Sequence, residues 1–270
     1  MTDHCQELKQ LMEKIYHDRG FDFREYKEST LVRRLDSRMR ARGVKTYADY
    51  ACVLDLDSSE YNKLFDALTI KVTSFFRDEV AFKALEEVVL PLLIHRGAET
   101  QRRLSIWTAG CATGQETYSI AILLLELLGV EIEQWNVTIL GTDIDLNALK
   151  RARDGIFTAN EVENIRPVWL KKYFIAEKRG FCVQPVLGHL VTFETHNMVS
   201  DPPYSGLDLV VCRNVIIYFN TALQTRVLKA FHEGLKVGGF LLLGKTETPV
   251  GPSSTLFVCM DSKAKVYRKL

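Results

Sequence analysis

The chain has 270 residues, 47% apolar and 26% charged, which is enough to bury a full α/β core and to build a small second domain. No apolar run reaches the roughly 18 to 20 residues that a membrane-spanning helix needs, and Met1 to Gln10 is too polar for a signal peptide, so we expect a soluble, cytoplasmic protein. The formal net charge is only +1, so electrostatic selection of a partner must come from local clusters of charge.

The first 75 residues carry apolar side chains at helical spacing and predict a small helical bundle. Short helices of this kind bury their apolar stripes only by packing together. Two of these helices are expected to end at Gly20 and Gly43. The expected helices span residues 6–17, 26–42, 47–54 and 60–70.

From residue 76 to residue 270, helical and strand patterns alternate, which predicts an α/β domain with a parallel sheet. Residues 256–260 and 265–268 are expected to close the sheet as an antiparallel pair. Residues 167–188 show no clear helix and suggest short strands in an inserted β subdomain. The expected strands are 104–110, 135–141, 190–194, 207–212 and 240–243, and the expected helices are 115–128, 146–153 and 222–235.

The six cysteines are scattered singly, without a C-x-x-C pair or a histidine at zinc-ligand spacing. We expect reduced, mostly buried thiols and no metal site. The positions are Cys5, Cys52, Cys111, Cys182, Cys212 and Cys259.

In an open parallel sheet, ligands bind beyond the carboxyl ends of the strands, and three segments converge there. The first is the turn from Gly110 to Glu116, where glycines allow close approach of a ligand and the helix start leaves amide donors free. Alone this turn is a weak indication. Turns of this kind also bind dinucleotides and other nucleotides. Glycine can also be present only because the shape of the turn requires it.

The second segment contains Asp143, at the end of the second strand. A carboxylate there can accept hydrogen bonds from both hydroxyls of a ribose, which favours an adenosine ligand. Asp145 is expected to cap the following helix. The alternative for both is an exposed acid without a ligand. Because the glycine spacing is not G-x-G-x-x-G, a pyrophosphate cofactor is disfavoured.

The third segment follows the strand at 207–212 and offers Arg213, Asn214 and Tyr218 to the same edge. A tyrosine half-buried for packing is the alternative for Tyr218. The tetrapeptide Asp201–Tyr204 spells the D-P-P-Y motif of methyltransferases that act on amino groups. In those enzymes the motif follows the strand that corresponds to residues 207–212. Here the tetrapeptide precedes that strand, so we interpret its prolines as turn-forming residues.

Together these residues strongly resemble the chemotaxis receptor glutamate methyltransferase (CheR) family over nearly the whole chain. The resemblance implies a Rossmann-like class I methyltransferase sheet, S-adenosylmethionine as cofactor without a metal, and methyl esterification of receptor glutamates. The matching motifs are Thr73–Asp78, Ala109–Ser119, Thr142–Asp145, His196–Met198 and Cys212–Phe219.

The resemblance also implies roles for single residues. Arg77 would fork onto the cofactor's carboxylate, Glu116 would accept from its ammonium, and Asp143 would bind the ribose. Arg213, Asn214 and Tyr218 would line the methyl-transfer end, and our hypothesis is that Tyr218 aligns the incoming carboxylate. The implied cofactor-binding residues are Lys71, Thr73, Arg77, Gly110, Glu116, Asp143, Asn197, Met198, Arg213 and Asn214, and the implied catalytic residues are Tyr218 and Arg77.

Three departures from the family pattern occur. Lys71 stands where the family usually has asparagine. Gln115 and Thr117 replace the usual glutamate and proline of G-E-E-P-Y. The segment Gly244–Glu247 replaces the common G-H/S-x-E.

A basic helix suggests how the substrate is chosen. Residues 23–45 contain eight Lys or Arg against three Asp or Glu. At about 100° per residue, Arg33 and Arg40 point away from the apolar stripe of the helix, and Arg34 and Arg38 flank it. A solvated face is the ordinary interpretation of such a run. The resemblance, in which this helix contacts the receptor, favours docking of glutamate-rich receptor helices.

Two other functions stay open at this point. One is a non-catalytic module that binds S-adenosylmethionine and docks on a receptor, and the other is a nucleic-acid methyltransferase that uses the basic patch. We expect a monomer that does not bind nucleic acid. A receptor tail peptide is a further candidate partner, at the inserted β subdomain.

Overall fold

The structure is a computed structural model that describes residues 2–69 and 72–270. The chain forms two compact units: a helical unit of residues 1–70 and 218–223, and a sheet unit of residues 71–217 and 224–270. The division falls slightly before the position near residue 75 that the sequence suggested. Phe75 is fully buried and packs edge-on against Phe157 and Phe174, so this segment goes with the sheet unit.

The helical unit contains the expected bundle. Leu31, Leu35 and Met39 are buried along one side of the second helix, because their spacing places them on one face. That helix ends at Gly43, whose φ of 69° is a left-handed conformation that glycine adopts without strain. The helices are α1 (Thr2–Arg19), α2 (Glu28–Arg42), α3 (Tyr47–Leu56) and α4 (Glu60–Leu68).

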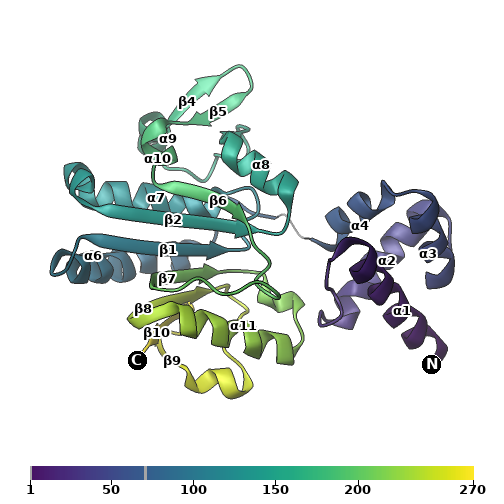
Figure 1. The fold of residues 1–270 in the computed structure, drawn as a ribbon. Helices are drawn as coiled ribbons and strands as arrows, with labels where there is room; N and C mark the ends of the chain where they lie inside the picture. The colour runs from purple at the N-terminus through teal and green to yellow at the C-terminus, as the bar shows by residue number, and fades with distance from the viewer. Residues whose placement is uncertain (1, 70–71) are drawn as a thin grey trace. The chain divides into compact units, whose positions relative to one another are not determined.

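The sheet unit is built on seven strands in the order β6-β2-β1-β7-β8-β10-β9 (Figure 1). Strands β6, β2, β1, β7 and β8 are parallel, and β10 runs antiparallel to β8 and to β9, as the sequence predicted. The α/β fold is thereby confirmed. The strands are β1 (Arg103–Ala109), β2 (Asn136–Asp143), β6 (Val191–Thr195), β7 (Leu207–Cys212), β8 (Leu235–Leu243), β9 (Phe257–Asp261) and β10 (Val266–Lys269).

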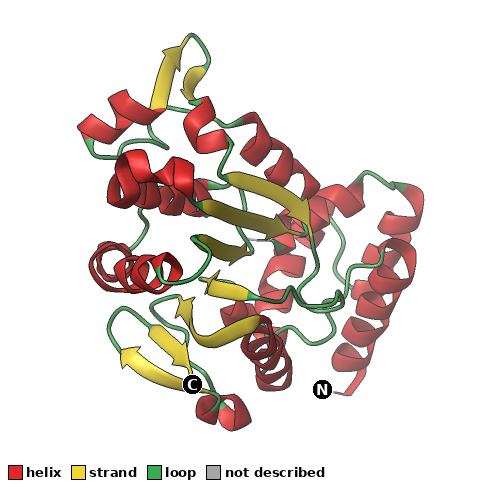
Figure 2. Cartoon of the chain, turned by 60° about the vertical axis from the view of Figure 1, so that its left-hand side comes forward, coloured by secondary structure: helices red, strands yellow, loops and turns green. Residues whose placement is uncertain are grey.

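Helices flank this sheet (Figure 2). Successive residues of β1 face opposite sides. Ile106 joins the core with residues of α7, whereas Trp107 packs edge-on against Phe231 of α11, with ring centroids 5.2 Å apart. The helices are α5 (Glu79–Ala84), η1 (Leu85–Val89), α6 (Leu90–Ala98), α7 (Gln115–Leu128), η2 (Gly129–Gln134), α8 (Leu146–Asp154), η3 (Ile216–Tyr218), α11 (Thr221–Gly234) and η4 (Gly251–Thr255).

The helical run over residues 79–98 was not predicted. A π-helical turn, η1, interrupts it, and Pro91 follows at the start of α6. A π turn shifts the angular position of every later side chain, so the apolar residues do not keep one helical period.

The inserted subdomain is a three-stranded antiparallel sheet in the order β3-β5-β4. The expectation that residues 167–188 lack a helix was wrong, because α9 spans seven of them. Pro167 occupies the first turn of α9, and Trp169 and Tyr173, four residues apart, bury one face of it. The elements are β3 (Ile156–Phe157), α9 (Pro167–Tyr173), β4 (Phe174–Glu177), β5 (Gly180–Val183) and α10 (Pro185–Gly188).

The five cysteines whose side chains are described all have free thiols. Cys111 and Cys212 are buried and Cys182 is half-buried. Cys52 and Cys259 are exposed, so the expectation of mostly buried thiols was wrong for these two. Cys259 lies on the edge strand β9, where most side chains face solvent. Among the residues that the structure describes, no helix combines the length and apolar character needed to cross a bilayer.

Candidate functional site

The turn that carries Arg77 is strained. Phe76 and Asp78, on either side of it, have φ values of 51° and 71°, a left-handed conformation that is costly for residues with a side chain. The N–H of Phe76 donates to the hydroxyl of Ser119 at 3.0 Å, which anchors the turn on α7. Arg77 is half-buried and lines a cavity of about 660 Å³. Strain held by specific contacts is typical of a functional segment.

Arg213 joins two carboxylates. Its Nη1 donates to Glu116 at 3.0 Å, and its Nη2 lies 3.4 Å from the carboxylate of Asp78. The side chain is almost fully buried, and within the described part of the chain its Nε has no hydrogen-bond partner. Burial raises the pKa of Glu116, while the charges of Arg213 and Arg77 act to lower it. The structure therefore brings Glu116, Asp78 and Arg213 together, and the charge of Arg77 lies close enough to act on Glu116.

Asp143 lies at the end of β2 and is held by backbone amides. Its Oδ2 accepts from the N–H of Ala112 and its Oδ1 from the N–H of Asp145, both at 2.9 Å. Burial raises the pKa of Asp143, and these amide bonds oppose the rise. A carboxylate has about four lone-pair sites, so acceptor capacity remains for ribose hydroxyls. Asp145 accepts from Asn147 and Ala148 and caps α8, as predicted.

The glycine-containing turn is tied to β2. The N–H groups of Gly110 and Cys111 donate to the carbonyl of Thr142 at 2.8 and 2.9 Å. Gly110 has a φ of 76°, and a Cβ there would lie 2.6 Å from Val215. Close packing against the segment after β7 therefore already requires glycine at this position. A cofactor contact of Gly110 stays a prediction.

One of the three departures from the family pattern, the pair Gln115 and Thr117, has hydrogen-bond partners inside the sheet unit. The hydroxyl of Thr113 donates to the side-chain oxygen of Gln115 at 2.7 Å. The hydroxyls of Thr108 and Thr117 share a hydrogen bond of 2.7 Å. Both Gln115 and Thr117 are buried, so they are satisfied parts of the core.

Asn197 and Met198 follow β6 and are half-buried. The N–H of Asn197 donates to Asp201 at 2.8 Å, and its side-chain oxygen accepts from the N–H of Val199 at 3.0 Å. These hydrogen bonds lie within the loop and hold its shape. Asn197 and Met198 both lie beyond the carboxyl end of β6. Thr73 is also half-buried, and Lys71 lies outside the described residues.

The D-P-P-Y tetrapeptide lies in the loop before β7, as predicted. Tyr204 packs edge-on against Trp107, with centroids 5.1 Å apart, and lies 4.8 Å from the ring of His196. The Nε2 of His196 lies 3.1 Å from the carbonyl of Pro202. Tyr204 therefore packs on the core, whereas Asp201, Pro202 and Pro203 are exposed.

From the sequence, Glu247 was noted only as part of the segment Gly244–Glu247, which departs from the family pattern, and the role of this residue was missed. It is 3% exposed, and its carboxylate accepts the N–H of Asn214, one of the predicted site residues, at 2.9 Å. Asn214 has a φ of 60°. The indication available from the sequence was an acid placed just after an apolar strand, where a buried charge needs donors.

Tyr218 belongs to the helical unit. Its carbonyl accepts from the N–H of Lys27 at 2.8 Å, and the next residue, Phe219, forms an antiparallel bridge with Tyr26. Residues 218–223 therefore join the segment before α2. The approach of Tyr218 to the cofactor residues of the sheet unit stays a prediction.

The four arginines of the basic helix divide into two pairs. Arg33 and Arg40 are exposed and line a shallow groove on α2. Arg34 is half-buried and donates to the carbonyl of Ala67, within the same unit. The fourth, Arg38, is also turned inward. The uniform basic face that the helical wheel suggested is thus reduced to Arg33 and Arg40.

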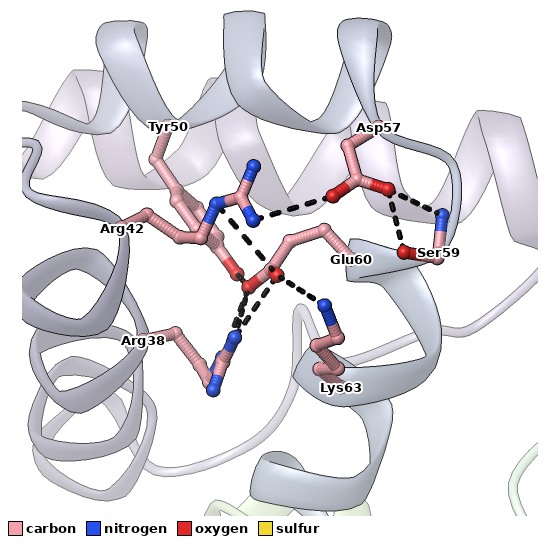
Figure 3. Close-up of polar contacts among 7 residues, drawn as sticks. All are labelled: Arg38, Arg42, Tyr50, Asp57, Ser59, Glu60 and Lys63. Atoms are coloured by element: carbon pink, nitrogen blue, oxygen red, sulfur yellow. Dashed lines mark hydrogen bonds and ion pairs between the residues drawn. The ribbon is translucent and has the colours of Figure 1, made fainter.

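Arg38 binds a buried carboxylate (Figure 3). Its Nε and Nη2 donate to Glu60 at 2.9 and 2.7 Å, and the hydroxyl of Tyr50 donates to the same carboxylate at 2.8 Å. Arg42 and Lys63 lie 3.9 Å away. Glu60 is completely buried, so this ion pair is part of the core of the bundle.

No group of three or more His, Cys, Asp or Glu side chains in residues 2–69 and 72–270 is arranged to hold a metal ion. Residues 71–266 match the family described as CheR methyltransferase, SAM binding domain, and residues 6–69 match CheR methyltransferase, all-alpha domain.

Curated relatives extend the match to nearly the whole chain. The chemotaxis protein methyltransferase of Borreliella burgdorferi is 30% identical over 93% of this chain and 91% of its own length. That of Salmonella typhimurium is 31% identical over 89% and 83%. An uncharacterized 104.1 kDa protein of Rhodobacter capsulatus is 33% identical, and there the match covers 92% of this chain but only 26% of the relative.

Proposed function

The chain belongs to the CheR methyltransferase family, and from this premise we propose that it methylates glutamate side chains of chemotaxis receptors. The products would be glutamate methyl esters and S-adenosylhomocysteine. The observation that carries the proposal is the set of polar side chains at the carboxyl ends of β1, β2 and β7. There Asp143 keeps acceptor capacity for a ribose, and Glu116 and Arg213 form a charged pair next to Arg77.

S-adenosylmethionine, the cofactor of the family, supplies a methyl group on a positively charged sulfur. Asp143 would hold its ribose, Arg77 its carboxylate and Glu116 its ammonium. Asn197 and Met198 would border the adenine. A glutamate substrate, with a pKa of about 4.3, is already ionised near neutrality. The protein therefore needs no general base, and its task is to exclude water and to align the carboxylate.

Labelled methyl transfer to a receptor cytoplasmic fragment tests the proposal. Methyl esters release labelled methanol in alkali, whereas N-methyl products do not. We expect base-labile label on the fragment and none on DNA or RNA. Base-stable label would contradict ester formation. Binding of S-adenosylhomocysteine without any transfer would favour the non-catalytic module instead.

Tyr218 is proposed as the residue that aligns the incoming carboxylate, through a hydrogen bond from its hydroxyl. Tyr218→Phe removes only that oxygen. We expect turnover to fall by about tenfold or more, as for a lost hydrogen bond to a charged group, with S-adenosylhomocysteine affinity barely changed. Tyr204→Phe is the matched control, since Tyr204 packs on Trp107. Unchanged turnover in Tyr218→Phe would refute the role.

Arg33 and Arg40 are proposed to dock the glutamate-rich receptor helices, because they are the exposed members of the basic set. Replacing both by alanine should raise KM for the receptor severalfold and weaken its dependence on salt. Docking by Arg34 and Arg38, which the sequence also predicts, needs a separate test, since their replacement also removes contacts inside the bundle. Equal KM in wild type and the Arg33/Arg40 variant would contradict docking on this face.

A receptor tail peptide is proposed as a second partner of the inserted subdomain. In the described sheet β3-β5-β4, strand β4 pairs with β5 on one side only. An extended peptide can add to such an edge as a further strand. Fluorescence anisotropy of labelled tail peptides tests this, with Ile175→Pro in β4 as the disrupting variant. A monomeric state stays a prediction, which light scattering checks.

A further inference from the structure

Glu247 gathers four backbone amides on one carboxylate. Its Oε2 accepts from the N–H groups of Asn214 at 2.9 Å and Gly244 at 2.6 Å. Its Oε1 accepts from those of Val215 at 2.9 Å and Ile217 at 3.2 Å. Two of the four donors, Asn214 and Val215, belong to the segment that connects β7 to η3, and Ile217 lies in η3 itself. One buried side chain thus fixes the path of residues 214–217.

The surrounding backbone is shaped around this carboxylate. Asn214 has a φ of 60°, a conformation that its hydrogen-bonded neighbours must hold in place. A Cβ on Gly244 would lie 2.6 Å from Oε2 of Glu247 and 2.7 Å from the nitrogen of Asn214. Glycine at this position therefore allows the two segments to approach.

We propose that Glu247 is a positioning residue for methyl transfer. It holds residues 214–217, so that Asn214 and Tyr218, the residue directly after this segment, are presented to the reaction. The proposal rests on the proposed function. Of the described residues predicted to bind the cofactor, Glu247 holds Asn214, and the principal ones do not depend on it. Asp143 is held by Ala112 and Asp145, and Arg213 is held by Glu116, without Glu247.

The four donors require two accepting oxygens, which a carboxylate supplies. In Glu247→Gln one oxygen becomes an NH₂ group, which would face two N–H groups and lose both bonds. The variant keeps the size of the side chain, so it changes the hydrogen bonding with little change in packing.

Asp208 supplies a matched control at the other end of β7. It is 4% exposed and binds Arg96 at 2.8 Å, Lys236 at 2.8 Å and the N–H of Ser105 at 2.9 Å. Asp208→Asn therefore also neutralises a buried, hydrogen-bonded carboxylate of the sheet unit. Residue 208 lies four residues before Cys212, roughly 13 Å along the strand, away from the segment that Glu247 holds.

The experiment compares the full-length chain and both variants in kcat and KM for a receptor fragment, in Kd for S-adenosylhomocysteine and in thermal unfolding. We expect Glu247→Gln to lower kcat at least tenfold while Kd changes less than about threefold. Asp208→Asn should lose stability with kcat within about twofold of wild type. The proposal is overturned if kcat survives in Glu247→Gln, if Kd rises in proportion to the loss of kcat, or if Asp208→Asn loses kcat equally.

Two further measurements keep the result decisive. If Glu247→Gln does not fold, Gly244→Ala displaces the same bonds by adding a Cβ, and the same split between kcat and Kd is expected. If the wild-type chain methylates no receptor fragment, the proposed function fails, and amide exchange then tests Glu247 alone. Faster exchange at residues 214, 215 and 217 in Glu247→Gln, but not in Asp208→Asn, supports the positioning role, and unchanged exchange overturns it.

Discussion

Buried carboxylates at the two ends of the parallel strands have different hydrogen-bond partners. At the amino end, Asp208 is bound by two cationic side chains, Arg96 and Lys236, and by one amide. At the carboxyl end, Asp143 and Glu247 are bound by backbone amides. A cation-bound carboxylate links elements and neutralises its own charge. An amide-bound carboxylate shapes a loop and keeps its negative charge at the site.

The helical unit follows the pattern of the amino end. Glu60 is completely buried and is bound by Arg38 and by the hydroxyl of Tyr50 (Figure 3). Glu116 is an exception at the carboxyl end, because Arg213 binds it. The comparison leads to a simple expectation: breaking cation-bound pairs should affect stability, and breaking amide-bound groups should affect binding or turnover.

The largest effect is expected at Arg38. Arg38→Met keeps the apolar stem but leaves Glu60 buried without its main partner, which should lower the free energy of unfolding by about 3 kcal/mol. All three tryptophans, Trp107, Trp135 and Trp169, lie in the sheet unit. Urea unfolding followed by far-ultraviolet circular dichroism should therefore shift, whereas the transition in tryptophan fluorescence should not.

Arg33→Met is the control for this prediction, because Arg33 is exposed on the same helix. It should change stability by less than about 0.5 kcal/mol. Affinity for S-adenosylhomocysteine should be unchanged in both variants. A loss of cofactor affinity in Arg38→Met would break the comparison between the two kinds of carboxylate.

Asp143 tests the opposite case. Asp143→Ala removes a carboxylate that we expect to bind two ribose hydroxyls, and loss of hydrogen bonds to a charged group should weaken S-adenosylhomocysteine binding by on the order of 100-fold. Calorimetry measures the effect. Asp154→Ala, at an exposed position at the end of α8, is the control and should bind as wild type does. Equal affinity in the two variants would contradict the ribose role.

The elements most accessible from the sequence were those with regular patterns. Residues 115–128 and 207–212 were predicted with the observed bounds, because one is a long apolar helix and the other a fully buried strand. The helical run over residues 79–98 was missed because the π turn η1 shifts its period. The helix α9 was missed because seven residues are too short for a periodic pattern.

For the candidate site, too, features that depend on neighbours in the sequence could be predicted, and features that depend on distant residues could not. Asp145 could be predicted as a helix cap, because capping depends on neighbours in the sequence. The inward turn of Arg38 could not, because its partner Glu60 lies 22 residues away and is chosen by packing between helices. Three of the four amides that Glu247 binds lie 30 to 33 positions away, and no local pattern indicates them.

The smallest effect is expected from pH, and it concerns a partly exposed group in the helical unit. Asp18 accepts from Lys14 at 2.8 Å and from the hydroxyl of Tyr61 at 2.5 Å. The hydrogen bond from Lys14, followed by that from Tyr61, lowers the pKa of Asp18 below its usual range. The folded pKa lies below the unfolded value of about 3.9, so this stabilisation is present above about pH 4 and is lost as pH falls.

Asp18→Asn should therefore show a smaller loss of stability on acidification below about pH 5 than the wild-type chain, measured by urea unfolding at a series of pH values. Lys14→Met removes the main cause of the pKa shift and should flatten the same window while the carboxylate stays in place. Burial raises the pKa of Glu247, which gives the opposite sign: ionising this carboxyl costs more in the folded state than in the unfolded state, so its titration lowers stability as pH rises. A wild-type pH profile in Asp18→Asn would show that the Lys14 pair does not distinguish the folded from the unfolded state, and the contrast between cation-bound and amide-bound carboxylates would not extend to the helical unit's surface.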